Sequence, residues 1–226
     1  MQRNFILSLL IVFSCINLNA QPAEPGGWLY YFGNQKINSK WNWHNEVQHR
    51  NYTLSGELEQ LLLRTGLGYT FQSGQNILLG YGFISANNYL SDANEAINVK
   101  EHRIYQQYIS QERFGRVYLQ HRYRFEERFL NDTFKFRYRY FLLAQIPLNH
   151  SSIQANTFYL AGYNELFIHH DEGNYFDRNR TALILGFSFT PQLRVEVGAM
   201  TQFLPTSSRT QLTIGFVNNL SLKQDS

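Results

Sequence analysis

The sequence of 226 residues is poor in cysteine and proline, with one and five residues respectively, and its mean hydropathy is only −0.37. A single thiol excludes an internal disulfide and a zinc site built from several thiolates. The formal net charge of +3 is too small to indicate nucleic acid as a partner. The sequence also lacks a glycine-rich phosphate-binding loop and the spacing of a zinc motif. The length suits one domain, and the low hydropathy argues against long apolar helices.

The first twenty residues have the pattern of a secretory signal peptide. Arg3 provides a positive start, residues 5–13 are apolar, and Ala20 offers a small residue before cleavage at Gln21. An alternative is a lipoprotein signal that ends at Cys15, for which Phe13 is a bulky neighbour. Cleavage after Ala20 removes Cys15, so the mature chain has no thiol and begins with a short flexible leader, residues 21–26.

Aromatic residues are abundant, with 15 tyrosines and 18 phenylalanines, and they recur with a period of two. In residues 116–125, apolar or ring-bearing side chains at odd positions alternate with Arg, Tyr and Gln at even positions. This alternation is typical of a strand with two different faces. Such runs are about nine to thirteen residues long, which suits a tilted strand that crosses a bilayer. They predict no helix in the mature chain and eleven strands, at residues 27–37, 40–52, 57–71, 76–86, 101–111, 116–129, 134–146, 157–168, 176–189, 193–203 and 209–220.

A secreted sandwich would show the same alternation, with its apolar face in the core. Two features favour a barrel in a membrane. Arg64 and Arg194 share the polar face with glycines, as expected where long side chains fill a narrow lumen. Aromatic residues end the apolar face, as in the girdles at membrane interfaces: Trp28, Trp41, Trp43, Tyr69, Phe71, Tyr89, Phe125, Phe129, Phe189 and Phe203. We therefore predict an all-β fold, a transmembrane antiparallel up-and-down β-barrel of 10–12 strands over residues 27–220, followed by a C-terminal tail, residues 221–226.

The lengths of the connections predict how the barrel is oriented. Short links are expected at residues 38–39, 72–75, 112–115 and 190–192, and long loops at residues 87–100 and 169–175. Because short turns face the periplasm in such barrels, the second to eleventh strands form an even set of ten with both ends periplasmic. The link at 147–156 is long where a short turn is expected. The strand at 27–37 is left over, either to pair with an unrecognised twelfth strand or to lie against the lumen.

The inward faces of these strands carry most of the charge. We expect a lumen network in which basic residues outnumber acidic ones: Glu46, Arg64, Arg122, Arg124, Glu126, Arg128, Lys135, Arg137, Arg139, Glu165, Arg180, Arg194 and Glu196. One interpretation is a structural network of ion pairs that fills a narrow barrel. The other is a small pore or binding cavity that favours anions. A register shift of one residue would reverse every assignment.

The seven histidines raise the question of an enzyme, since some barrel enzymes that act on lipid place His beside Ser or Asp at the membrane boundary. The local candidates are Asn149-His150-Ser151-Ser152 and His169-His170-Asp171-Glu172, both expected in loops. Neither has the neighbouring glycine and asparagine pattern of the lipase type, and adjacent residues on one loop lack the spread of a metal site. We therefore predict no enzyme, no catalytic residue, no metal and no cofactor.

Several strand patterns resemble domain of unknown function family 2490. They are the spacing from Trp41 through Trp43 to Glu46, and the segments 103–107, 122–129, 163–167 and Asn179-Arg180. The resemblance covers most of the mature chain and implies a barrel in the outer membrane of a Gram-negative bacterium. It carries no agreed reaction.

Two classes of function remain open. The first is a structural protein or a narrow small-solute pore with a basic lumen. The second is a loop-mediated binding protein, or an outer-membrane barrel enzyme acting on lipid. The expected partners are outer-membrane lipid, the barrel assembly and periplasmic chaperone machinery, and a small anionic solute, with no nucleic acid.

Overall fold

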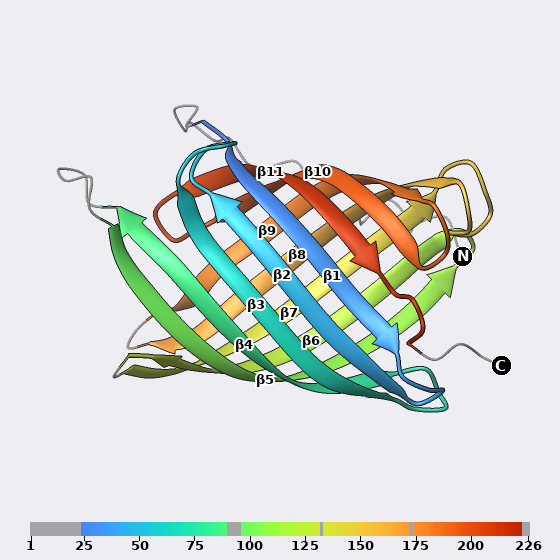
Figure 1. Cartoon of the computed structure of the whole chain (residues 1–226), viewed down its shortest axis with the longest axis horizontal. Coiled ribbons are helices and arrows are strands. Elements are labelled where there is room, and N and C mark those ends of the chain that lie inside the picture. Colours follow the sequence, from blue (N-terminus) through green and yellow to red (C-terminus); the bar gives the residue numbers. More distant parts are fainter. Residues whose placement is uncertain (1–23, 90–95, 132, 172–173, 223–226) are drawn as a thin grey trace, which may run out of the picture.

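The computed structural model describes residues 24–89, 96–131, 133–171 and 174–222, and it contains eleven strands that close into a barrel (Figure 1). The predicted signal peptide and the first half of the leader, residues 21–23, lie outside these residues. The strands overlap all eleven predicted ones, so the all-β barrel is confirmed. They are β1 (Gly26–Lys36), β2 (Trp41–Asn51), β3 (Leu58–Thr70), β4 (Asn76–Tyr89), β5 (Ala96–Phe114), β6 (Val117–Leu130), β7 (Thr133–Pro147), β8 (Thr157–Asp171), β9 (Asn174–Ser188), β10 (Leu193–Phe203) and β11 (Ser208–Asn218).

The odd number of strands determines how the barrel closes. Each strand reverses the direction of the one before, so the first and the eleventh run the same way. They pair in parallel, from Gly26 beside Gln211 to Gly33 beside Asn218, and all other neighbours are antiparallel. The prediction of a wholly antiparallel barrel is therefore wrong at this one seam. The first strand neither meets a twelfth nor lies in the lumen, because it pairs with both β2 and β11.

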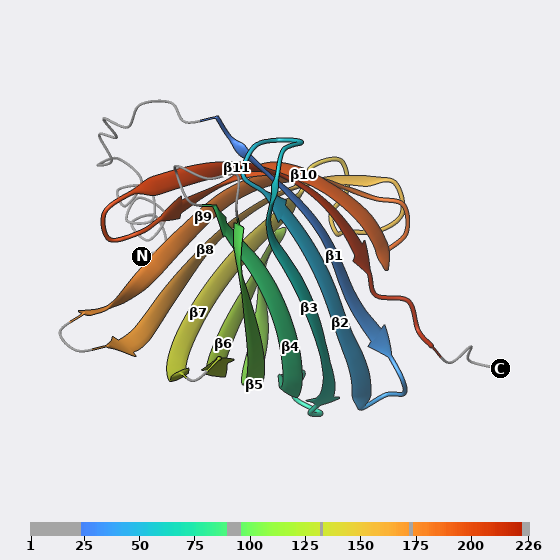
Figure 2. The same ribbon diagram turned by 60° about the vertical axis from the view of Figure 1, so that its left-hand side comes forward.

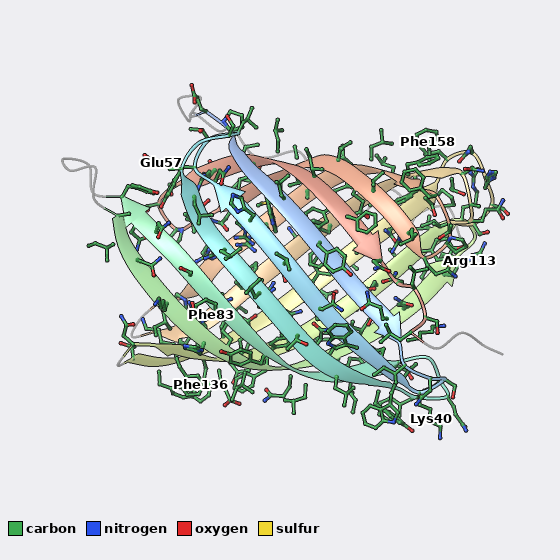
Figure 3. All side chains as sticks on the ribbon, viewed as in Figure 1. Lys40, Glu57, Phe83, Arg113, Phe136 and Phe158 are labelled. Atoms are coloured by element: carbon green, nitrogen blue, oxygen red, sulfur yellow. The ribbon has the colours of Figure 1, made fainter. Side chains whose placement is uncertain are left out.

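The two ends of the barrel differ in their connections. The end that carries Lys40, here called the Lys40 end, holds the connections 37–40, 71–75, 115–116, 148–156 and 189–192, and the opposite Glu57 end holds 52–57 and 204–207 (Figure 3). Because β1 and β11 run the same way, the first strand begins at the Glu57 end and the last strand finishes at the Lys40 end (Figure 1).

The prediction of two long loops, which would lie at the Glu57 end, is wrong for most of the residues concerned. The first predicted loop, 87–100, is largely strand, because β4 continues to Tyr89 and β5 begins at Ala96. The second, 169–175, is likewise taken up by β8 and β9, except for residues outside the described part. Backbone pairing continues past the apolar section of each hairpin, for example from Asn87 to Asn98, since a strand ladder needs no apolar side chains.

The two faces of the barrel wall are reversed relative to a soluble protein. The outer face carries the exposed large apolar residues, and Ile214 in the middle of β11 is 59% exposed beside Val197 and Leu29. The inner face buries arginines, carboxylates and tyrosines, and the carboxylate of Glu126 is 0% exposed. The strands run obliquely along the wall when the barrel is turned (Figure 2), as closure of a sheet requires. No helix among the described residues is long and apolar enough to cross a membrane.

Glycines on the inner face make room for tyrosine rings from the next strands. A Cβ atom at Gly80, Gly186 or Gly215 would overlap with the ring of Tyr105, Tyr159 or Tyr30, respectively. Rings that cover glycines in this way restore packing that glycine itself cannot provide.

Trp28 departs from the predicted aromatic girdle. It is buried in the lumen beside Tyr30, Ala182 and Met200 instead of facing outward. The tryptophans at Trp41 and Trp43 are about 40% exposed on the outer face, as a girdle position requires.

Candidate functional site

Glu126 on β6 is the centre of a charged cluster that crosses the lumen. Its oxygens accept hydrogen bonds from Arg137 at 2.8 Å and from Arg139 at 2.6 Å, both on β7. Three further guanidinium groups lie within 3.8 Å of the same carboxylate, those of Arg64, Arg103 and Arg124. Five strand positions on β3, β5, β6 and β7 therefore place five cations around one buried anion. We call these six residues the Glu126 cluster.

Other carboxylates pair with arginines of the cluster and with Arg122, Arg128 and Arg178. Glu101 accepts from Arg103 and Arg128, and Glu165 accepts from Arg122 and Arg139. Glu46 on β2 accepts from Arg64 at 2.8 Å and lies beside His44. Asp177 lies between Arg137 and Arg178. Period-two alternation produces this arrangement, because every second residue of a strand points to the same face.

The structure brings together ten of the thirteen lumen residues named from the sequence. The continuous network contains Glu46, Arg64, Arg122, Arg124, Glu126, Arg128, Arg137, Arg139, Glu165 and, through the ring of Phe167, Arg180. Glu196 lies apart and accepts hydrogen bonds from Tyr30 and Tyr159. Arg194 lies over the ring of Tyr159, with 5.7 Å between its Cζ atom and the ring centroid. Lys135 is exposed near the Glu57 end of β7.

Sequence reasoning missed several members of the site: Trp28, Arg50, Glu101, Arg103 and Asp177. Arg50 follows Glu46 and Gln48 at a spacing of two, and Glu101 precedes Arg103 in the same way. Alternation alone would therefore have found three of them. Asp177 is different, because the pairing of β8 with β9 is irregular after Phe167, where Arg178 is opposite Phe167 but Phe176 is opposite Ile168. A bulge of this kind changes which residues face inward.

A cavity of about 620 Å³ occupies the lumen beside the Glu126 cluster. It reaches the Lys40 end, where Asn38, Lys40 and Gly74 line it. Arg124 and Arg139 form part of its wall and contact Glu126 on their other side. Arg64 of the cluster also lines it, whereas Glu126, Arg103 and Arg137 do not.

The cavity wall has an excess of positive charge and an apolar side. Nine cationic side chains line it, and the carboxylates are Glu46, Glu165 and Glu196. The cations are Lys36, Lys40, Arg50, Arg64, Arg122, Arg124, Arg139, Arg180 and Arg194. Aromatic and apolar side chains of β1 and β7 to β9 form one side of it, and neutral polar residues make up much of the remainder. The residues of the apolar side are Trp28, Tyr30, Phe32, Phe141, Leu143, Ala161, Tyr163 and Ile184. Such a wall can hold an anion that also has an apolar or ring-shaped body.

Several residues that line the cavity have buried donors without a hydrogen-bond partner in the protein. The Nε atoms of Arg50, Arg64, Arg122 and Arg194 have none, nor does Nη1 of Arg124 or the indole nitrogen of Trp28. Buried polar groups without partners are rare, and a cluster of them requires an explanation such as water or a ligand. These six groups are donors, and the unpartnered hydroxyl of Thr213 in the same wall can donate as well, so an acceptor, most effectively an anion, would satisfy them.

The two histidine segments considered for catalysis lie at opposite ends of the barrel. Asn149 and His150 are in the connection 148–156, where Asn149 bonds to Asn156 and Phe158 and His150 bonds to Gln154. The other segment was expected in a loop, but residues 169–171 belong to β8, and Glu172 lies outside the described residues. Within the described ranges, no group of three or more His, Cys, Asp and Glu residues could hold a metal ion.

Comparison with known proteins identifies the family. No curated protein and no solved structure matches the chain at a significant level. The family described as "Protein of unknown function (DUF2490)" matches residues 25–213, which include ten complete strands and about half of β11. The chain therefore belongs to this family of proteins of unknown function.

Proposed function

We propose that this protein is a transmembrane β-barrel of the outer membrane of a Gram-negative bacterium, whose basic lumen takes up a small anionic solute from the Lys40 end. The membrane assignment is supported by the barrel wall, whose outer face is apolar and whose inner face is charged. Water around such an outer face would be unfavourable by about 25 cal/mol per Å² of apolar surface, whereas lipid is its natural solvent. The proposal assigns no reaction to the chain.

Strand lengths and connections support one orientation. About 9–11 residues of a tilted strand cross the bilayer, while β4 to β9 have 14–19 residues. The extra residues extend the hairpins at the Glu57 end, which we assign to the cell surface, and the Lys40 end then faces the periplasm. In this orientation the partners are outer-membrane lipid and, during insertion, the barrel assembly machinery and periplasmic chaperones.

The cavity carries the second part of the proposal. Nine cations against three carboxylates give its wall a net positive charge, and charge of one sign in a low-dielectric cleft concentrates ions of the opposite sign. The Glu126 cluster fills part of the lumen beside this space. This favours a cavity with one entrance, at the Lys40 end, over a pore that runs through the whole barrel.

Fractionation and reconstitution test the membrane part. The mature chain should remain in the outer-membrane fraction after extraction with urea, and after refolding it should float with liposomes. Recovery of folded, monomeric protein in buffer without detergent would contradict the membrane assignment. In planar bilayers the wild type should show no steady conductance, and a steady anion-selective current would restore the open-pore hypothesis.

Fluorescence quenching tests the entry of anions. Trp28 is buried and lines the cavity, whereas Trp43 is exposed on the outer face and Trp41 is exposed at the rim of the cavity. In the variant with Trp41→Phe and Trp43→Phe, Trp28 should be the remaining emitter. Iodide should quench its emission, and caesium at the same ionic strength should quench it much less. If neither ion quenches, the lumen is closed to solutes and its charges have only a structural role.

A further inference from the structure

Two of the cavity's arginines face the same aromatic ring. The guanidinium carbon of Arg50 on β2 lies 4.1 Å from the centroid of Trp28, and that of Arg180 on β9 lies 5.6 Å from the same centroid. Both side chains are buried, at 6% and 7% exposure. Two cations around one ring repel each other strongly in a medium of low dielectric constant.

Among the described residues no carboxylate is in direct contact with this pair, and Glu59 and Glu165 act on Arg50 and Arg180 only from farther away. None of the ion pairs in the described part of the chain includes Arg50 or Arg180. Each guanidinium group is instead held by a neutral amide: Arg50 donates to Gln48 at 2.6 Å, and Arg180 donates to Gln202 at 2.9 Å. The glutamines fix the positions of the cations and leave their charge in place.

Two donors at this pair and its ring have no hydrogen-bond partner. The Nε atom of Arg50 and the indole nitrogen of Trp28 are buried without a partner, and both residues line the cavity together with Arg180 and Tyr163. A single acceptor with several oxygens would satisfy these donors and neutralise both cations. Buried charges are otherwise retained only when they are paired.

We propose that Arg50, Arg180 and Trp28 form a binding site for the phosphate group of a small phosphate monoester. A phosphate monoester carries a charge between about −1.5 and −2 at neutral pH, which matches two arginines that have no carboxylate in contact, and its oxygens suit guanidinium groups. A carboxylate would neutralise only one of them. The inference rests on the proposed function, because the ligand must first enter the lumen.

The apolar side of the cavity determines which group the ligand can carry next to its phosphate. Tyr163 and Ile184 lie on the wall near Trp28, and Phe141 and Leu143 extend this wall on β7. A cavity of about 620 Å³ is within the range that accommodates small organic ligands. The phosphate should therefore be attached to a ring or an apolar group, and bare inorganic phosphate should bind more weakly.

Phenyl phosphate is a suitable probe, with inorganic phosphate, benzoate and phenol for comparison. In the folded variant with Trp41→Phe and Trp43→Phe, phenyl phosphate should change the emission of Trp28 and protect it from iodide. Inorganic phosphate should do so at higher concentration, benzoate weakly and phenol not at all. Arg50→Gln and Arg180→Gln should each weaken the binding of phenyl phosphate roughly tenfold or more, the loss expected for one charge-assisted hydrogen bond.

Arg209→Gln is the matched control, because Arg209 is paired with Glu59 at 2.7 Å and does not line the cavity. It should leave the affinity unchanged. Stability without ligand gives a second readout. Removing Arg50 or Arg180 relieves a repulsion, so neither variant should unfold at a lower urea concentration, whereas a purely structural pair would lose stability.

The outcomes separate this inference from the proposed function. If iodide quenches Trp28 but phenyl phosphate neither binds nor protects Trp28 from iodide, the lumen admits anions and the proposal of a phosphate site is wrong. Equal binding of benzoate and phenyl phosphate would overturn the choice of phosphate. Binding that survives both arginine substitutions would also overturn the site. If no anion reaches Trp28, the proposed uptake of anions fails first.

Discussion

Tyr30 on β1 donates a hydrogen bond of 2.6 Å to Glu196 on β10, across the intervening strand β11. The ring of Tyr30 lies over Gly215 of β11, where a Cβ atom would overlap with it. A second tyrosine, Tyr159 on β8, donates to the other oxygen of Glu196 at 2.5 Å. The hydrogen bond from Tyr30 to Glu196 therefore reinforces the parallel seam from inside the lumen across three strands, and Tyr159 extends this bridge to β8.

Tyr30→Phe should destabilise the folded barrel by about 1.5–3 kcal/mol, the range for a hydrogen bond to a charged group. The substitution keeps the ring over Gly215 and removes one of the two hydroxyl donors of a buried carboxylate. The measurement is the free energy of unfolding by urea in detergent or liposomes. Tyr108→Phe is the control, since Tyr108 is 38% exposed on the outer face. Equal stability of the two variants would show that the bridge contributes nothing.

The strands could be predicted from the sequence because alternation is a local property. In β6 and β7, each side chain's face follows from its position, and Phe134 and Phe136 are exposed outward while Arg137 and Arg139 are buried. The parallel seam was not predicted because neither Gly26 nor Gln211 contains information about its partner. Closure depends on the parity of the whole set of strands, which is a global property.

The candidate site could be predicted only in part, for a related reason. Alternation identifies which residues face inward, but it does not identify which of them meet across the lumen. Glu165 and Arg122 are 43 positions apart and form a hydrogen bond of 2.7 Å. The inward position of Trp28 was missed because a tryptophan near the start of a strand resembles a girdle residue. Only the tertiary structure shows that Arg50 covers its ring.

Ile214→Arg should destabilise the barrel by about 2–4 kcal/mol, the cost of an arginine on the lipid face near the middle of the bilayer. Ile214 lies in the middle of β11 and is 59% exposed. The control is Leu54→Arg, at a residue that is 55% exposed in the connection 52–57. In that position arginine should be tolerated. Unfolding in liposomes measures the difference, and similar tolerance of the two substitutions would contradict a membrane around β11.

The odd number of strands predicts that the two termini lie on opposite sides of the membrane. Cleavage after Ala20 would leave a mature chain without cysteine, so a single cysteine can report its own position. A membrane-impermeant maleimide should label Pro25→Cys on intact cells, and Ser221→Cys only after the outer membrane is permeabilised. Ser55→Cys and Ser73→Cys in the turns of the two ends provide references that do not depend on the seam. Labelling of both termini from the same side would show that β1 does not cross with the other ten strands.

Glu126→Gln should cause the largest loss of stability among single neutralisations in the lumen, about 3–5 kcal/mol. The substitution removes a negative charge to which Arg137 and Arg139 both donate, and which three further arginines share within 3.8 Å. The cations that remain are left buried with less compensation.

Neighbouring Glu127 is the matched control, because it accepts a hydrogen bond from Gln106 outside the cluster, at 3.2 Å. Glu127→Gln should change the free energy of unfolding by less than about 1 kcal/mol, the scale of an exposed pair. If both variants unfold at the same urea concentration, the five arginines do not depend on Glu126, and the cluster is held together by the packing of the wall instead.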